Sequence, residues 1–111
     1  MFSRTRQGAV DVITGEVPLN VDSCDEFMRQ IDACLIQGQP RLVLDLRNVP
    51  FIDSAGLELM LDIQDRCVES GGTCKLAAPN PLCTDILTAT AVGLEFETYP
   101  DAIEAAGSFA L

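Results

Sequence analysis

The chain has 111 residues, of which 48% are apolar, and its 17 acidic against 7 basic residues give a formal net charge of −10. This length suits one domain over residues 1–111, and the apolar fraction argues against a disordered chain. The negative charge argues against a nucleic-acid partner, because phosphate binding needs a basic surface.

The N-terminal segment predicts two short strands that pair as a hairpin. Phe2–Arg6 alternates weakly in polarity, and Ala9–Gly15, "AVDVITG", is rich in β-branched residues and closes on a glycine. Gln7-Gly8 suits the turn between them. Pro18 then prevents a central strand from continuing.

A first amphipathic helix is predicted from about residue 23. Ser23 and Glu26 have the spacing of a capping box, and Gly38 and Pro40 are the expected stop signals. The following run Arg41–Leu46, "RLVLDL", is nearly all apolar, as in a strand covered on both faces. The apolar face of the helix recurs at i, i+3, i+4 and i+7: Cys24, Phe27, Met28, Ile31, Cys34 and Leu35.

A second helix is predicted from about Asp53 to Glu69. Asp53 suits the N-cap, and Ile52 and Leu57 suit a hydrophobic staple around it. Gly71-Gly72 is expected to end this helix as a turn. It is not interpreted as a phosphate-binding loop, because neither a G-x-G-x-x-G nor a Walker pattern is present.

The remaining third of the chain repeats the alternation of strand and helix. Thr73–Ala78 predicts a strand. A third helix is expected from Pro81 to about Ala91, after an Asn80 cap and with Gly93 as its C-cap. "EFETY" predicts a short edge strand, on which Glu95 and Glu97 share a solvated face that guards against edge pairing. A final helix over Pro100–Ala106 is expected to stop at Gly107.

This order of elements predicts an α/β fold. We expect a mixed, mostly parallel sheet of about four or five strands, with an N-terminal hairpin and about four helices. The first ten residues lack the apolar stretch of a signal peptide, and no apolar run reaches the length of a membrane span. The five cysteines are scattered, form no C-x-x-C pair and are expected to be free core residues of a cytoplasmic protein.

The second helix carries an acidic stripe. At about 100° per residue, one arc holds Ser54, Glu58, Asp62, Asp65 and Glu69. Another, apolar arc holds Leu57, Met60, Leu61 and Val68, and is widened by Leu59, Ile63 and Cys67. Ser54 therefore heads a solvated face of the helix.

Two interpretations of Asp53-Ser54 are open. In the simpler one, both side chains satisfy free N–H groups of an ordinary helix start. In the functional one, Ser54 is an exposed hydroxyl at the carboxyl end of a parallel strand, the usual place for function in such a sheet. Phosphorylation there would add about −1.5 to −2 charges and release a partner that accepts only the neutral side chain.

Catalysis by this chain is not expected. It contains no histidine, which excludes Ser-His and Cys-His couples and His-liganded zinc. Its only lysine, Lys75, lies in another predicted strand, and "DSAG" is not the G-x-S-x-G elbow of hydrolases. No catalytic residue, metal site or cofactor is therefore predicted, and an enzyme on a flavodoxin-like sheet is disfavoured.

The segments "LVLDLRNVPFIDSAGLELML", "GGTCKLAAPNP" and "TAVGLEFETYPDAIEA" together resemble the STAS domain family of bacterial anti-sigma factor antagonists. The resemblance runs from about Val12 to Ala106, and strand–"DSAGL"–helix is its most specific part. It implies a non-enzymatic regulator of transcription that acts by partner switching.

In such antagonists the unphosphorylated form binds an anti-sigma factor serine/threonine kinase and frees the sigma factor, and a phosphatase resets the switch. Carried over by position, the resemblance implies that Ser54 is the phosphoacceptor. It implies a partner-binding surface made of Asp53, Ser54, Ala55, Gly56, Leu57, Glu58 and Asp62. Gly56 would allow close approach at the start of the helix. Nucleotide and magnesium would belong to the kinase.

The sequence departs from the family pattern in two places. Ala55 replaces a second hydroxyl residue, which leaves Ser54 as the acceptor. Pro18 stands about where an aspartate is expected after Gly15-Glu16, in a longer loop, so the resemblance implies nothing about kinase recognition there. "DSAGL" also resembles a STAS subunit of the ABC transporter for bacterial lipid asymmetry. The alternative partner is therefore an ABC transporter ATPase.

Overall fold

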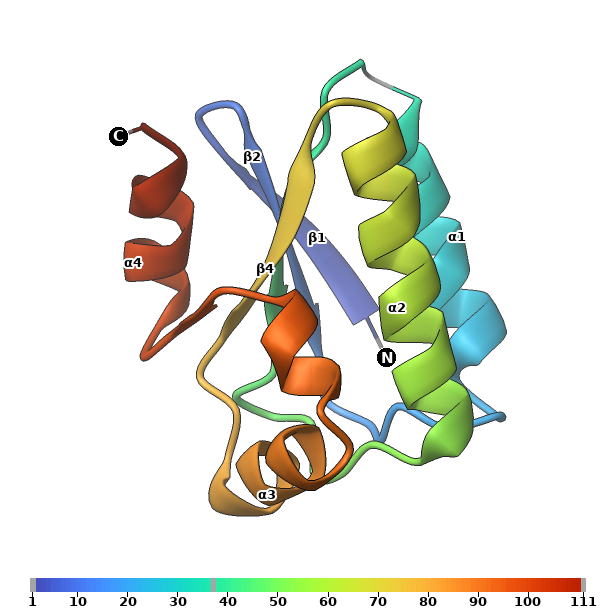
Figure 1. Cartoon of the computed structure of the whole chain (residues 1–111). Coiled ribbons are helices and arrows are strands. Elements are labelled where there is room, and N and C mark those ends of the chain that lie inside the picture. Colours follow the sequence, from blue (N-terminus) through green and yellow to red (C-terminus); the bar gives the residue numbers. More distant parts are fainter. Residues whose placement is uncertain (1, 37, 111) are drawn as a thin grey trace.

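A five-stranded sheet forms the centre of the fold, seen in a computed structural model that describes residues 2–36 and 38–110. Its strands follow chain order: β1 (Phe2–Gln7), β2 (Val10–Gly15), β3 (Arg41–Asp45), β4 (Thr73–Ala77) and β5 (Thr98–Tyr99). β1 pairs antiparallel with β2, and all other pairs are parallel. The predicted mixed sheet with an N-terminal hairpin is therefore confirmed (Figure 1).

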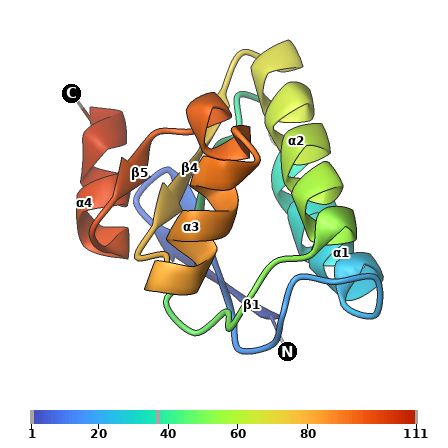
Figure 2. The ribbon, with the colours of Figure 1, turned by 60° about the horizontal axis from the view of Figure 1, so that its bottom comes forward.

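Helices cover both faces of the sheet (Figures 1 and 2). α1 (Cys24–Leu35) and α2 (Ser54–Glu69) lie side by side on one face, and α4 (Ala102–Gly107) lies on the other. α3 (Pro81–Ala89) sits at the end of the sheet where α2 begins, which is the carboxyl end of the parallel strands. Two 3₁₀ turns, η1 (Val92–Glu95) and η2 (Ser108–Ala110), follow α3 and α4.

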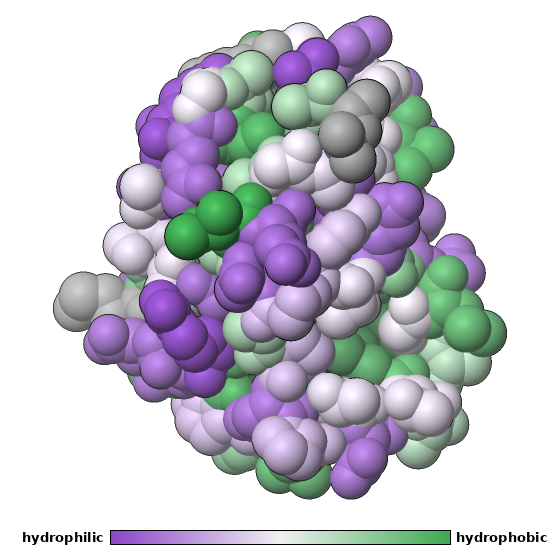
Figure 3. Space-filling view, turned by 90° about the vertical axis from the view of Figure 1, so that its left-hand side faces the viewer, coloured by the Kyte–Doolittle hydropathy of each residue, from purple (hydrophilic) through white to green (hydrophobic). Residues whose placement is uncertain are grey.

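Two apolar clusters fill the layers on either side of the sheet. Leu42 and Leu44 of β3 join the large cluster under α1, α2 and α3, whereas Val43 joins a smaller one under α4. β3 is thus covered on both faces, as its continuous apolar run predicts. Seen from the α4 side, hydrophobic residues reach the surface in patches between polar ones (Figure 3).

The capping box predicted at Ser23 is wrong. The Ser23 hydroxyl donates to the Pro18 carbonyl at 2.6 Å and makes no cap to α1. The Glu26 side chain does not complete the box either, because its Oε1 accepts from the Phe2 N–H at 3.2 Å. The Asn20 Oδ1 takes over the local turn by accepting from the N–H groups of Asp22 at 3.0 Å and Ser23 at 3.2 Å.

α2 spans the range expected for the second helix, with a narrower buried face. Its buried stripe is Gly56, Met60, Ile63 and Cys67. Val68 was predicted on the apolar arc but is 59% exposed. It follows Cys67, the last residue of the stripe, and so points about 100° further around the helix, away from the core. The predicted glycine turn follows, with a positive φ of 83° at Gly71.

The connection from α3 to β5 differs from the prediction. The chain reverses at Ala91, which has φ +63°, and Gly93 lies inside η1 instead of capping α3. The Thr90 hydroxyl stabilises this reversal by donating to the Ile86 carbonyl at 2.7 Å. β5 is only two residues long, and Glu95 lies in η1. The prediction that Glu95 and Glu97 share a strand face is therefore wrong.

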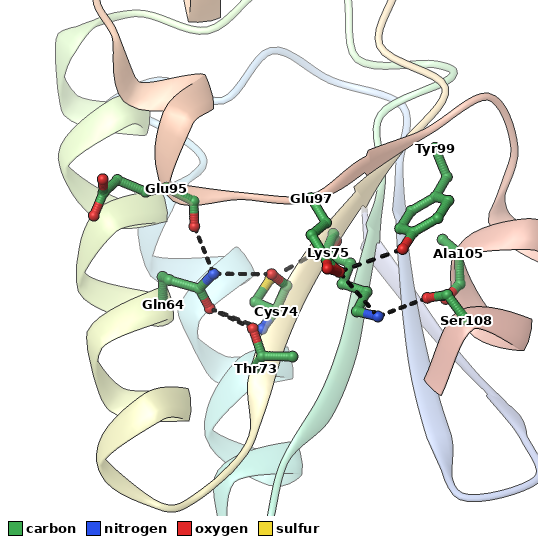
Figure 4. A network of polar contacts seen from close by, with 9 residues as sticks. All are labelled: Gln64, Thr73, Cys74, Lys75, Glu95, Glu97, Tyr99, Ala105 and Ser108. Atoms are coloured by element: carbon green, nitrogen blue, oxygen red, sulfur yellow. Dashed lines mark hydrogen bonds and ion pairs between the residues drawn. The ribbon is translucent and has the colours of Figure 1, made fainter. Parts of the chain in front are cut away.

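The Gln64 side chain explains why β5 is short. Its Oε1 accepts from the Cys74 N–H at 2.8 Å, and its Nε2 donates to the Cys74 carbonyl at 3.1 Å (Figure 4). The same Nε2 donates to the Glu95 carbonyl at 2.8 Å. A helix side chain thus fills the edge of β4 where β5 would otherwise pair.

Replacing Gln64 with leucine is expected to destabilise the protein. The change leaves backbone groups of Cys74 and Glu95 without their partner, which costs about 1–3 kcal/mol per group left unsatisfied. Urea unfolding followed by circular dichroism measures the loss. Gln30→Leu on α1 is the matched control, because none of the hydrogen bonds of the described residues involves its side-chain amide. Equal stability of the two variants would contradict this role for Gln64.

The last helix, α4, begins at Ala102 and not at Pro100 as predicted, and it includes Gly107, the predicted stop. Asp101 caps it by accepting from the Glu104 N–H at 2.8 Å. Gly107 is its last helical residue, and the chain continues directly into η2. The Ser108 hydroxyl, donating to the Ala105 carbonyl at 2.7 Å, holds this continuation in place.

The cysteines behave as core residues. Cys34, Cys67, Cys74 and Cys83 are buried and free, and Cys24 is partly buried. Burial raises the pKa of the Cys67 thiol to about 11 and raises the pKa of Cys74 well above its ordinary value. These thiols stay protonated at neutral pH, which suits packing and not reactivity.

Candidate functional site

Two loops meet at the carboxyl end of the parallel strands and position the start of α2. The Leu19 N–H donates to the Phe51 carbonyl at 3.1 Å, and the Asp53 N–H donates to the Leu19 carbonyl at 3.0 Å. These bonds make a parallel bridge between Leu19 and Ile52. The loop after β2, which contains Pro18, therefore lies against the segment that leads into Asp53-Ser54.

Asp53 caps α2, as the sequence predicts. Its backbone is extended, with φ −95° and ψ −174°, and its Oδ1 accepts from the Gly56 N–H at 3.0 Å. Its carbonyl accepts from the Leu57 N–H at 2.9 Å and so begins the helical ladder. Asp53 thus supplies both the side-chain cap and a negative charge at the helix N-terminus.

Ser54 is the first residue of α2 and is exposed. Among the hydrogen bonds of residues 2–36 and 38–110, none involves its hydroxyl. The interpretation of Ser54 as a capping side chain is therefore not supported, because Asp53 alone performs that role. The hydroxyl is held on a rigid first turn and points at no protein partner within the described chain.

Gly56 is buried where α2 presses on the loop after β2. A Cβ placed on Gly56 would collide with the Leu19 carbonyl oxygen and would lie 2.9 Å from Ile52 Cγ2. The expected close approach is therefore present, and it is made to this chain's own backbone. Gly56 seats the helix and offers no surface of its own to a partner.

The other predicted partner-binding residues differ in their exposure. Glu58 and Asp62 are exposed, whereas Ala55 and Leu57 are only partly so. Asp62 pairs with Arg66 at 3.2 Å, and Arg66 also reaches Asp32 of α1 at 3.6 Å. The acidic stripe of α2 is exposed at every predicted position: Ser54, Glu58, Asp62, Asp65 and Glu69.

The surroundings of Ser54 are acidic. None of the ion pairs within the described residues includes Asp53, Asp25 or Glu58, so no basic side chain offsets these carboxylates. Burial, followed by the charges of Asp53 and then Asp25, raises the pKa of the Cys24 thiol at the start of α1. Cys24 therefore remains a small neutral neighbour of Asp53.

Two exposed apolar residues near the site were not found from the sequence. Val21 is 72% exposed in the loop before α1, and Phe51 is 39% exposed in the loop before α2. These two loops are the ones joined at Leu19 and Ile52. The only sequence signal was an apolar residue standing in each loop beside a helix start, which is too common to single out.

The match to a family model covers most of the chain. Residues 3–105 match the model described as STAS domain. None of the curated proteins compared with the chain matches it. No helix within residues 2–36 and 38–110 combines the length and apolar character needed to cross a membrane.

Solved structures give the same assignment. A Thermotoga maritima protein described as a candidate anti-sigma factor antagonist has 25% identity and a TM-score of 0.89, over 96% of this chain and 92% of that chain. An anti-sigma-factor antagonist (STAS) domain protein from Planctomyces limnophilus has 25% identity and a TM-score of 0.87, over 99% and 98%.

The fold also recurs at lower identity. The anti-sigma factor antagonist SpoIIAA in its unphosphorylated form has 16% identity and a TM-score of 0.81, over 100% of this chain and 98% of that chain. Sheet order, length, the "DSAGL" helix start and the family match over residues 3–105 agree with one another. The chain belongs to the STAS domain family.

Proposed function

We propose that this chain is a non-enzymatic, cytoplasmic anti-sigma factor antagonist that works by partner switching. One observation carries the proposal: Asp53 caps α2, which leaves the adjacent Ser54 hydroxyl exposed and unbonded within the described chain. A serine acting as the N-cap would have its side-chain oxygen on a backbone N–H. Ser54 is instead available to a kinase without any loss of native contacts.

The unphosphorylated form binds an anti-sigma factor serine/threonine kinase. Its contact surface is the exposed part of Asp53–Leu57 together with Glu58 and Asp62. Val21 and Phe51 beside it supply exposed apolar area, and its removal from water favours association with a partner. The unpaired carboxylates around them favour a basic partner surface and speed its approach.

Phosphorylation of Ser54 ends this contact and leaves the fold intact. The phosphate adds about −1.5 to −2 charges to a surface that already carries Asp53 and Glu58. The positive end of α2 stabilises the modified state, so the helix start is not lost. A partner that had closed over a neutral serine would face a desolvated dianion, and it dissociates. A phosphatase then restores the binding form.

Site-specific labelling tests the modification. Wild type, Ser54→Ala and Ser70→Ala are incubated with an extract of the source cells and magnesium ATP, and phosphosites are located by mass spectrometry. Ser70 is the matched control, because it is also exposed and lies at the other end of α2. We expect label on wild type and on Ser70→Ala, and none on Ser54→Ala. Label that persists on Ser54→Ala would place the acceptor elsewhere and overturn the assignment of Ser54.

A further inference from the structure

The C-terminal segment α4–η2, residues 102–110, crosses the face of the sheet opposite α1 and α2 (Figures 1 and 2). We name it the C-terminal strap. α4 has only six residues, too few for a helix to be stable without tertiary contacts. The buried residues of α4 are alanines, which bury little apolar area each. These are Ala105 and Ala106, packed with Val10, Val12, Val43 and Ala77 of the sheet.

One buried cation holds the far end of the strap. Lys75 of β4 is 7% exposed and is the only lysine in the chain. Its Nζ donates to the Ser108 hydroxyl at 2.7 Å, and that hydroxyl donates to the Ala105 carbonyl at 2.7 Å (Figure 4). Two hydrogen bonds in series therefore connect β4 to η2 and to the last turn of α4.

Aromatic rings and a carboxylate complete the surroundings of this ammonium. The Lys75 Nζ lies 4.3 Å from the ring centroid of Phe109 and 5.5 Å from that of Tyr99. It pairs with Glu97 Oε2 at 3.2 Å, and the Tyr99 hydroxyl donates to the same oxygen at 3.3 Å. Cation–π attraction is strongest when the cation is desolvated, as it is here. Ser108 and Phe109 of η2 thus converge on a single charge.

The start of the strap, at Ala102 and Ile103, packs less closely on the sheet than its end does. A hollow of about 300 Å³ separates the start of α4 from β1, β2 and β3, with Thr14, Asp45 and Asp101 among its lining residues. Ile103, the largest apolar residue of α4, also borders this hollow and is 76% exposed. Within α4 the residues on the sheet are therefore alanines, whereas Ile103 is turned outward, and the large apolar contact of the strap comes from Phe109 of η2.

We propose that the C-terminal strap is a releasable lid whose latch is the Lys75 ammonium. It opens as one unit while the sheet, α1 and α2 stay folded. Segments with few apolar contacts open in this way, because their free energy of local opening is smaller than the free energy of global unfolding. Opening uncovers the apolar strip of Val10, Val12, Val43 and Ala77 on this face. The device lies on the opposite face from α2 and is independent of the function proposed for Ser54.

Native-state hydrogen exchange of the full chain, read by NMR, tests the latch. In wild type we expect amides of residues 103–109 to exchange at least tenfold faster than those of Met60–Cys67 in α2. Lys75→Gln removes the charge and should accelerate the strap amides at least a further tenfold, with a smaller change in α2. Lys75→Arg keeps the charge and should restore most of the protection. Arg66→Gln removes a cation from the other face and should leave the strap unchanged.

Two results would overturn the latch. One is a wild-type strap that exchanges in step with α2, which would make it part of the cooperative core. The other is a Lys75→Gln variant that accelerates both regions equally. If Lys75→Gln does not fold, Ser108→Ala and Glu97→Gln each remove one bond to the ammonium. Strap exchange unchanged in both of these variants would equally contradict the proposal.

Discussion

Replacing Gly56 with alanine is expected to lower stability by about 2–3 kcal/mol, the upper part of the usual range of about 1–3 kcal/mol for forcing extra volume into a packed site. The added Cβ would collide with the Leu19 carbonyl oxygen. That oxygen cannot simply retreat, because it accepts the Asp53 N–H at 3.0 Å. Relief of the clash therefore separates the two loops that set the start of α2. For a domain of this size the melting temperature should fall by roughly 10–20 °C.

Thermal unfolding followed by circular dichroism measures the effect. Gly107→Ala is the matched control, because nothing lies within 4 Å of a Cβ placed there and its φ is not in the left-handed region. That variant should be neutral or slightly stabilised, since alanine is the better helix former. A Gly56→Ala protein as stable as Gly107→Ala would show that the close approach to Leu19 is not needed.

Replacing Ser54 with aspartate is expected to weaken partner binding by about 2–5 kcal/mol, or roughly thirty-fold to several thousand-fold in Kd. The fold should not change, because the Ser54 hydroxyl has no bonds to lose and an acid in the first helical turn is favourable. The added charge stands beside Asp53 and Glu58, which have no ion-pair partner among the described residues. A binding surface that accepts the neutral serine must therefore desolvate a further charge.

Titration calorimetry with the purified kinase partner measures this loss. Ser70→Asp is the control, because it adds the same charge at the exposed far end of α2. We expect Ser70→Asp to bind like wild type and both variants to melt within a few degrees of it. Equal Kd values for Ser54→Asp and wild type would contradict a switch at Ser54.

Patterns of several residues were sufficient to predict most of the fold. The apolar run of β3, the periodicity of α1, the extent of α2, and the Asp53 and Asn80 caps were predicted correctly, since each depends on neighbours in sequence. Asn80, for example, accepts from the Cys83 N–H at 2.8 Å. The exposed stripe of α2 was predicted for the same reason.

Predictions failed where a partner distant in sequence competed with the local pattern. Ser23 and Glu26 have the spacing of a capping box, but their side chains hydrogen-bond to the backbone of Pro18 and Phe2 instead. Gln64 fills the edge of β4 and shortens β5, which no local pattern reveals. Gly93 was the expected cap of α3, yet Ala91 makes the turn with a positive φ.

The candidate site was predicted in part. Strand, "DSAGL" and helix indicated Asp53 and Ser54, and the division of roles between them follows from the bond between Asp53 Oδ1 and the Gly56 N–H. The contribution of the loop after β2 was not predictable, because it depends on the pairing of Leu19 with Ile52 across more than thirty residues of chain. The same pairing joins the loops that contain Val21 and Phe51.

Affinity capture from the source cells tests the Ser54 switch most directly. Immobilised wild type and Ser54→Asp are exposed to the same extract, and retained proteins are identified and quantified by mass spectrometry, with Ser70→Asp as the charge-matched control. We predict that wild type and Ser70→Asp retain a serine-kinase anti-sigma factor and that Ser54→Asp loses it. Retention of that kinase by all three baits, or of an ABC transporter ATPase with its permease in its place, would contradict the proposed function.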